Sequence, residues 1–159
     1  MKATRQFGAA LAGVCATAFL VAAPAHAGPF AGAEATKDHY GVIFHIDEGG
    51  QATIKKTLTN VENLLHDPRL KGKVQVELIA NSKGFAVYVK NNGFEDKLKE
   101  LQKEGVILAQ CSNTLHELHV DRKDLYSFVS IVPSGMGEIT LREAEGWAYI
   151  HPSPPKSVM

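Results

Sequence analysis

Residues 40–46 read Tyr-Gly-Val-Ile-Phe-His-Ile, a run that is apolar at nearly every position. A strand with one solvated face alternates apolar and polar residues, whereas a strand covered on both faces has no need to. The run therefore predicts a central strand of a parallel sheet, with structure packed against both of its faces.

Four further apolar runs follow, and amphipathic segments separate them. We expect strands at 74–80, 106–109, 128–132 and 147–150. Helices are expected at 54–65, 84–90, 93–105, 114–120 and 136–144. The segment 84–90 would also suit a strand by propensity, but the topology favours a helix. The strand at 74–80 carries polar residues at alternate positions, which places it nearer an edge of the sheet.

Five strands that alternate with helices predict an α/β fold of three layers around a five-stranded, mostly parallel sheet. The simplest arrangement is the flavodoxin-like strand order 2-1-3-4-5. In that order the first and third strands are neighbours whose connections leave in opposite directions. Such a switch point opens a crevice at the carboxyl ends of the strands, where we expect a ligand to bind.

The first 27 residues have the three parts of a secretory signal peptide. Lys2 and Arg5 precede an apolar stretch at 7–23, and the small-residue ending Ala25-His26-Ala27 follows it. A membrane anchor is the alternative, but the apolar stretch falls short of the ~20 residues that a spanning helix needs. We therefore expect cleavage before Gly28 and a periplasmic protein.

Removal of the signal peptide would leave 132 residues, enough for one domain with its own core. The mature chain would carry fifteen basic and seventeen acidic residues, a balance that does not favour nucleic acid. We expect no membrane association after cleavage. The predicted organisation is a signal peptide at 1–27, a flexible segment at 28–38, one domain at 39–152 and a disordered tail at 153–159.

Cys111 would be the only cysteine of the exported chain, because Cys15 lies within the signal peptide. A single thiol cannot form an internal disulfide. Cys111 directly follows the third predicted strand and precedes a helix that Thr114 and Glu117 would open as a capping box. A helix N-terminus favours the thiolate form, so this position favours a reactive thiol over a buried apolar filler.

Further candidate side chains meet Cys111 at the carboxyl edge of the predicted sheet. Backbone amides at the helix starts there would hold an anionic ligand. The candidates for substrate binding are Ser112, Asn113, Thr114, Ser134, Gly135, His45 and Asp47.

Several motifs in order resemble the DsrE/DsrF-like family, which includes the YchN-like proteins. They are Cys111-Ser112-Asn113-Thr114-Leu115, Asp124-Leu125, Val132-Pro133-Ser134-Gly135 and the ending at 146–152. The resemblance spans about residues 40–152. It implies a parallel α/β fold, a homotrimer or homohexamer, and a sulfur atom carried as a persulfide on Cys111 without a cofactor. Its partners would be a small sulfur-containing anion or a protein acceptor thiol. The sulfur-relay members are cytoplasmic, whereas this chain has a predicted export signal.

Two other functions remain open at this point. Cys111, His116 and His119 offer a thiolate and two imidazoles that could bind a metal ion, although their spacing is not an established zinc-finger spacing. The chain could also be a non-catalytic oligomeric binding module, with Cys111 buried or linked between subunits.

Overall fold

The computed structural model describes residues 29–152. The predicted signal peptide and the predicted tail at 153–159 lie outside these residues. The elements in chain order are β1 (Tyr40–Ile46), α1 (Gln51–Leu65), β2 (Val74–Ala80), the 3-10 helix η1 (Ser82–Tyr88), α2 (Glu95–Lys103), β3 (Ile107–Cys111), α3 (Ser112–Glu117), the 3-10 helix η2 (Arg122–Asp124), β4 (Ser130–Val132), α4 (Gly135–Ala144) and β5 (Ala148–Ile150). Residues 29–39 contain no helix or strand. No helix in the described part has the length and hydropathy needed to cross a membrane.

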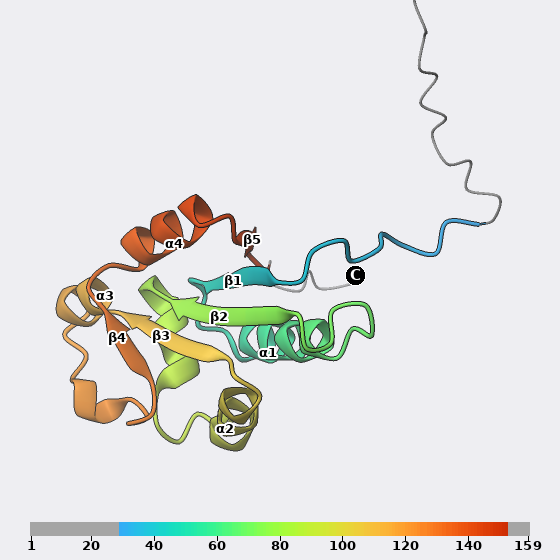
Figure 1. The fold of residues 1–159 in the computed structure, drawn as a ribbon. Helices are drawn as coiled ribbons and strands as arrows, with labels where there is room; N and C mark the ends of the chain where they lie inside the picture. The colour runs from blue at the N-terminus through green and yellow to red at the C-terminus, as the bar shows by residue number, and fades with distance from the viewer. Residues whose placement is uncertain (1–28, 153–159) are drawn as a thin grey trace, which may run out of the picture. The chain divides into compact units, whose positions relative to one another are not determined.

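The strands form one five-stranded sheet in the order β4-β3-β2-β1-β5, and every neighbouring pair is parallel. Figure 1 shows α4 on one face of the sheet and α1 and α2 on the other. This arrangement follows from right-handed crossovers, because the chain steps in one direction from β1 to β4 and then reverses past β1 to reach β5. The predicted three-layer, flavodoxin-like α/β class is confirmed.

The predicted strand order 2-1-3-4-5 is wrong, because β2 lies in the middle of the sheet between β1 and β3. The alternating polar residues of β2 suggested a solvated edge strand. Glu77, however, is only 1% exposed, and its carboxylate accepts a hydrogen bond of 2.8 Å from Arg142 Nε on α4. An ion pair with a covering helix therefore takes the place of solvent at this strand.

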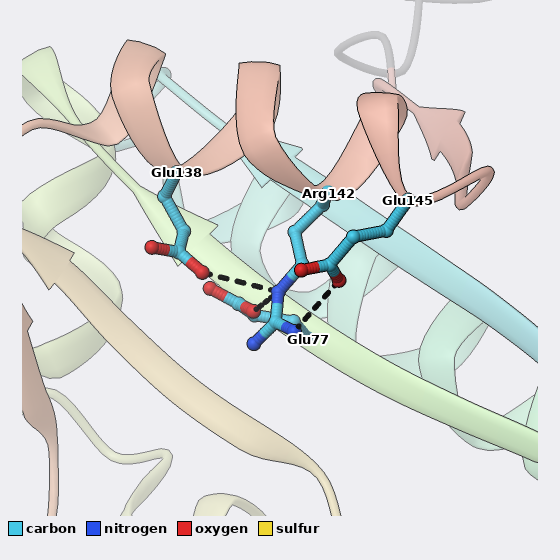
Figure 2. Close-up of polar contacts among 4 residues, drawn as sticks. All are labelled: Glu77, Glu138, Arg142 and Glu145. Atoms are coloured by element: carbon cyan, nitrogen blue, oxygen red, sulfur yellow. Dashed lines mark hydrogen bonds and ion pairs between the residues drawn. The ribbon is translucent and has the colours of Figure 1, made fainter.

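Arg142 is the centre of a polar network between α4 and the sheet (Figure 2). Its Nε lies 2.8 Å from Glu77 Oε2 and 3.0 Å from Glu138 Oε1, and its Nη1 lies 3.4 Å from Glu145 Oε2. Its guanidinium lies over the Trp147 ring, 4.3 Å from the ring centre. Burial raises the pKa of the Glu77 carboxyl, and the nearby Arg142 offsets this only in part.

The two faces of the sheet differ greatly in apolar packing. The face under α1 and α2 carries the main core, which includes Phe44, Leu78, Leu108, Ile54, Leu58, Leu98 and Leu101. The face under α4 carries a small cluster of Ile43, Ile79, Ala109 and Ile139, with Val132 and Trp147 packed against it. Helix α4 is thus attached by few apolar side chains and by the Arg142 network.

Two local predictions had different outcomes. Residues 84–88 are helical as favoured, as part of the 3-10 helix η1, whereas Val89 forms an isolated bridge with Leu125 and Lys90 lies in a turn. The capping box of Thr114 and Glu117 is wrong, because α3 already begins at Ser112 and Cys111 occupies its N-cap position without a side-chain cap. Cys111 is accordingly the last residue of β3 rather than the first residue beyond it.

Candidate functional site

Cys111 lies at the junction of β3 and α3, close to the start of α4. It is a free thiol and only 5% exposed. A Cβ built on Gly135, the first residue of α4, would lie 3.7 Å from the sulfur. The beginnings of two helices therefore converge on one buried sulfur atom.

Several hydrogen-bond donors surround the Cys111 sulfur. Burial raises the pKa of the thiol, but the backbone N–H of Gly135, the backbone N–H and hydroxyl of Thr114 and the backbone N–H of Asn113 lower it. The donors outweigh burial, so the pKa of the Cys111 thiol lies below its ordinary value. The geometry favours a thiolate at a largely buried position.

The Thr114 hydroxyl oxygen accepts a hydrogen bond from another group, which leaves its hydrogen free to be donated to the sulfur. Thr114 is buried, and its Oγ1 accepts the backbone N–H of Ser82 at 3.0 Å. Ser82 begins η1, so this contact joins the segment after β2 to the start of α3. The Thr114 side chain thus contributes to the thiol site rather than to a helix cap.

The start of α4 brings Gly135, and not Ser134, against the thiol. Ser134 is the N-cap residue of α4, and its Oγ accepts the backbone N–H of Gly137 at 3.2 Å. A Cβ on Gly135 would lie 3.2 Å from Cys111 Cβ and 3.5 Å from Asn81 Cβ. The missing side chain therefore lets the backbone of α4 approach both residues closely.

Asn81 immediately follows β2, and two backbone hydrogen bonds fix its position. Its N–H donates to Ile46 O at 3.1 Å, and its carbonyl accepts the Gly84 N–H at 2.8 Å. A Cβ on Gly84 would clash with the backbone carbonyl of Ile46, so only glycine fits where η1 passes the end of β1. This close approach fixes Asn81 between β1 and the start of α4.

His45 forms a partly buried hydrogen-bonded group with Asn81 and Tyr149. Its Nε2 lies 2.8 Å from Asn81 Oδ1, and its Nδ1 lies 2.7 Å from the Tyr149 hydroxyl. Because Asn81 Oδ1 can only accept, His45 Nε2 donates, and Nδ1 of the neutral ring accepts the Tyr149 hydroxyl. Next to this group His151 Nε2 lies 2.8 Å from Asp47 Oδ1. Tyr149, at 43% exposed, brings the group to the surface.

The predicted crevice between the first and third strands is wrong in its position. In the observed order β2 separates β1 from β3, and the neighbouring strands whose connections leave in opposite directions are β3 and β4, because β3 leads outward to β4 and β4 leads back across the sheet to β5. Cys111, the last residue of β3, therefore lies at the switch point, and His45 on β1 does not. Asn81 connects the two, because it contacts His45 on one side and the start of α4 beside Cys111 on the other.

Sequence reasoning missed Asn81, Tyr149 and His151 at this edge. Asn81 follows its strand directly, so listing every polar residue at the end of a strand would have identified it. Tyr149 and His151 approach His45 only because β5 pairs with β1, a pairing that the predicted order did not contain.

The other predicted site residues contribute less to the thiol site or do not lie in it. Asn113 has an exposed side chain and contributes its backbone N–H, and Ser112 is half-buried. His116 and His119 are exposed. Within residues 29–152, no group of three His, Cys, Asp or Glu side chains is placed to hold a metal ion, so the alternative set of Cys111, His116 and His119 has no geometric support.

Comparisons with known proteins place the fold but not the chemistry. No family model and no curated protein matches the sequence. A solved structure from Methanobacterium thermoautotrophicum, described as the protein of unknown function MTH1491, superimposes with a TM-score of 0.66 at 39% sequence identity. The match covers 71% of this chain and 99% of that one. The chain belongs to the same family as the Methanobacterium protein MTH1491.

Proposed function

We propose that this protein is an exported, DsrE-like sulfur carrier that holds sulfane sulfur as a persulfide on Cys111. The observation that carries the proposal is the position of the buried Cys111 at the start of α3 with the first residue of α4 against it, where the nearby backbone N–H groups of Gly135, Thr114 and Asn113 and the Thr114 hydroxyl lower the pKa of the thiol. Donors in this number stabilise a thiolate, the form of cysteine that attacks sulfur. The residues that resemble the DsrE/DsrF-like family include this same cysteine.

The chemistry needs no oxidant and no cofactor. The Cys111 thiolate attacks the outer sulfur of thiosulfate or of a polysulfide, and the S–S bond of the donor breaks. The bonding electron pair leaves with sulfite or with the shortened polysulfide, and Cys111 keeps the sulfur as Cys-S-S⁻. The outer sulfur of Cys-S-S⁻ takes up a proton from water, and an acceptor thiolate then attacks it. The S–S bond breaks, its electron pair leaves with Cys111 as the thiolate, and the acceptor becomes the persulfide. The donors around Cys111 stabilise that leaving group.

The burial of Cys111 restricts its partners in the first step. Because Cys111 is only 5% exposed, a small reagent is expected to reach its thiol more readily than a bulky one. A small sulfur-containing anion fits this restriction, and the backbone N–H groups match its charge. A protein acceptor would have to present its thiol on a narrow projection.

Location and assembly complete the proposal. The signal peptide expected at 1–27 would direct the carrier to the periplasm. The family resemblance favours a homotrimer or homohexamer, with a thiol protein as the eventual acceptor.

The direct test is the intact mass of reduced, mature protein after treatment with polysulfide and, separately, with thiosulfate. We expect a gain of about 32 Da, one sulfur atom, that dithiothreitol reverses. The Cys111→Ser variant should gain nothing, since it keeps the size of the side chain but lacks the thiol. A protein that stays unmodified by both donors, although its thiol is shown to be reduced, would rule out sulfur carriage from these donors.

A further inference from the structure

Helix α4 is held by an unusually small apolar contact for an element that completes the thiol site. Among its residues only Gly135 and Ile139 are buried. Gly135 lies against Cys111, since a Cβ built on it would lie 3.7 Å from the sulfur, and its backbone N–H lowers the pKa of the thiol. Ile139 is the one α4 side chain in the small apolar cluster on this face. Apolar packing of this size resists sliding along the sheet only weakly, because it is not directional.

The Arg142 network supplies the directional contacts that α4 otherwise lacks. Arg142 follows Gly135 by seven residues, about 10 Å along the helix axis at 1.5 Å per residue. Its Nε is fixed by Glu77 at 2.8 Å, and its guanidinium is stacked on the Trp147 ring at 4.3 Å. Figure 2 shows the Arg142 side chain reaching from α4 to Glu77 on β2.

This ion pair is not explained by stability alone. Glu77 is almost completely buried, and its Oε1 has no hydrogen-bond partner among the described residues. Apolar residues of similar size at a buried pair commonly serve stability as well or better. In some proteins a charged pair at such a position serves instead to give one defined register between two elements.

We propose that Glu77 and Arg142 are positioning residues of the thiol site: their ion pair fixes α4 along the sheet so that the Gly135 N–H stays on the Cys111 sulfur. The inference rests on the proposed function only for the use made of the thiol. Neither side chain touches the sulfur, and both act through the backbone of α4.

The Glu77→Gln variant separates this role from a direct charge effect. Removal of a negative charge by itself would lower the pKa of the Cys111 thiol, because a nearby negative charge disfavours a thiolate. Displacement of the Gly135 N–H would raise that pKa instead. The two explanations therefore predict shifts of opposite sign for one substitution.

The experiment is the rate of alkylation of Cys111 by iodoacetamide as a function of pH, with unloaded protein. The midpoint of the profile reports the pKa of the thiol, and the plateau at high pH reports access to it. We expect the midpoint to rise by about half to one pH unit in Glu77→Gln and in Arg142→Met, as when a hydrogen bond to a charged group is weakened. A midpoint in Glu77→Gln that is unchanged or lower would overturn the proposal.

Three control variants test whether loss of stability alone moves the midpoint. Ile139→Val weakens the apolar contact of α4, and Glu145→Gln removes a peripheral carboxylate from Arg142, so both should keep the wild-type midpoint. The double variant Glu77→Gln/Arg142→Met contains no unpaired buried charge and should fold even if a single variant does not. Its midpoint should remain raised, and a return to the wild-type value would contradict positioning by the pair.

The test is independent of sulfur carriage. Failure of the wild-type protein to gain sulfur would reject the proposed function, whereas a raised midpoint in the Glu77 variant would still show that the pair positions the thiol site. Sulfur loading in all variants with unshifted midpoints would reject only the positioning role.

Discussion

Replacement of Arg142 by methionine is expected to lower the free energy of unfolding by about 3 kcal/mol at pH 7, the largest loss of stability that we predict. The substitution keeps a long apolar stem over Trp147 but removes the partner of Glu77. Glu77 is buried and cannot recover hydration, so its charge would be left uncompensated. Urea denaturation of both proteins measures the difference.

The loss should depend on pH. Burial raises the pKa of the Glu77 carboxyl, so the folded chain binds more protons than the unfolded chain and this group lowers stability as the pH rises above about 4.3. Without Arg142 the pKa of Glu77 rises further, so the penalty extends to higher pH. The variant should lose less stability at pH 5 than at pH 7.5, and the added Glu77→Gln substitution should recover much of the loss at pH 7.5. An equal loss at both pH values would show that Arg142 stabilises through packing alone.

The second large effect concerns the first residue of α4. Gly135→Pro should reduce the thiolate fraction of Cys111 at pH 7 by about tenfold or more, because it removes an N–H that donates to a charged sulfur. Proline is tolerated at the first position of a helix, where the N–H has no partner within the helix. Ser134 already has the extended conformation that a residue before proline requires.

Gly135→Ala is the matched control for this variant. Alanine adds a Cβ 3.2 Å from Cys111 Cβ, as proline does, but it keeps the N–H. The rate of iodoacetamide alkylation at pH 7 should therefore be much lower in the proline variant than in the alanine variant. Equal rates in the two variants would mean that the Gly135 N–H does not activate the thiol.

The fold class could be predicted because continuous apolar runs in the sequence do form buried parallel strands. The continuous apolar run at 40–46 does form the buried strand β1, with a parallel strand on each side. The order of the strands could not be predicted in the same way. Glu77 appeared to mark a solvated edge, and only the tertiary contact with Arg142, 65 residues later, shows why a carboxylate lies in the middle of the sheet.

The candidate site was predicted only in part, because some of its contacts depend on tertiary structure that the sequence does not show. The end of β3 and the turn after β4 were correctly identified as neighbours, since a Cβ on Gly135 would contact Cys111. Thr114 was assigned to a helix cap because its spacing to Glu117 fits one, but its oxygen is engaged by Ser82. Asn81 could have been listed as a polar residue at the end of a strand, but no local pattern in the sequence indicates the path of η1 that holds it against His45 and Gly135.

The most direct test of the central claim is the full pH profile of Cys111 alkylation in the wild-type protein. The donors of Gly135, Thr114 and Asn113 should place the midpoint below the ~8.5 of an ordinary thiol. A midpoint at or above that value would contradict the account, because burial would then outweigh the donors and Cys111 would be a buried, inert thiol.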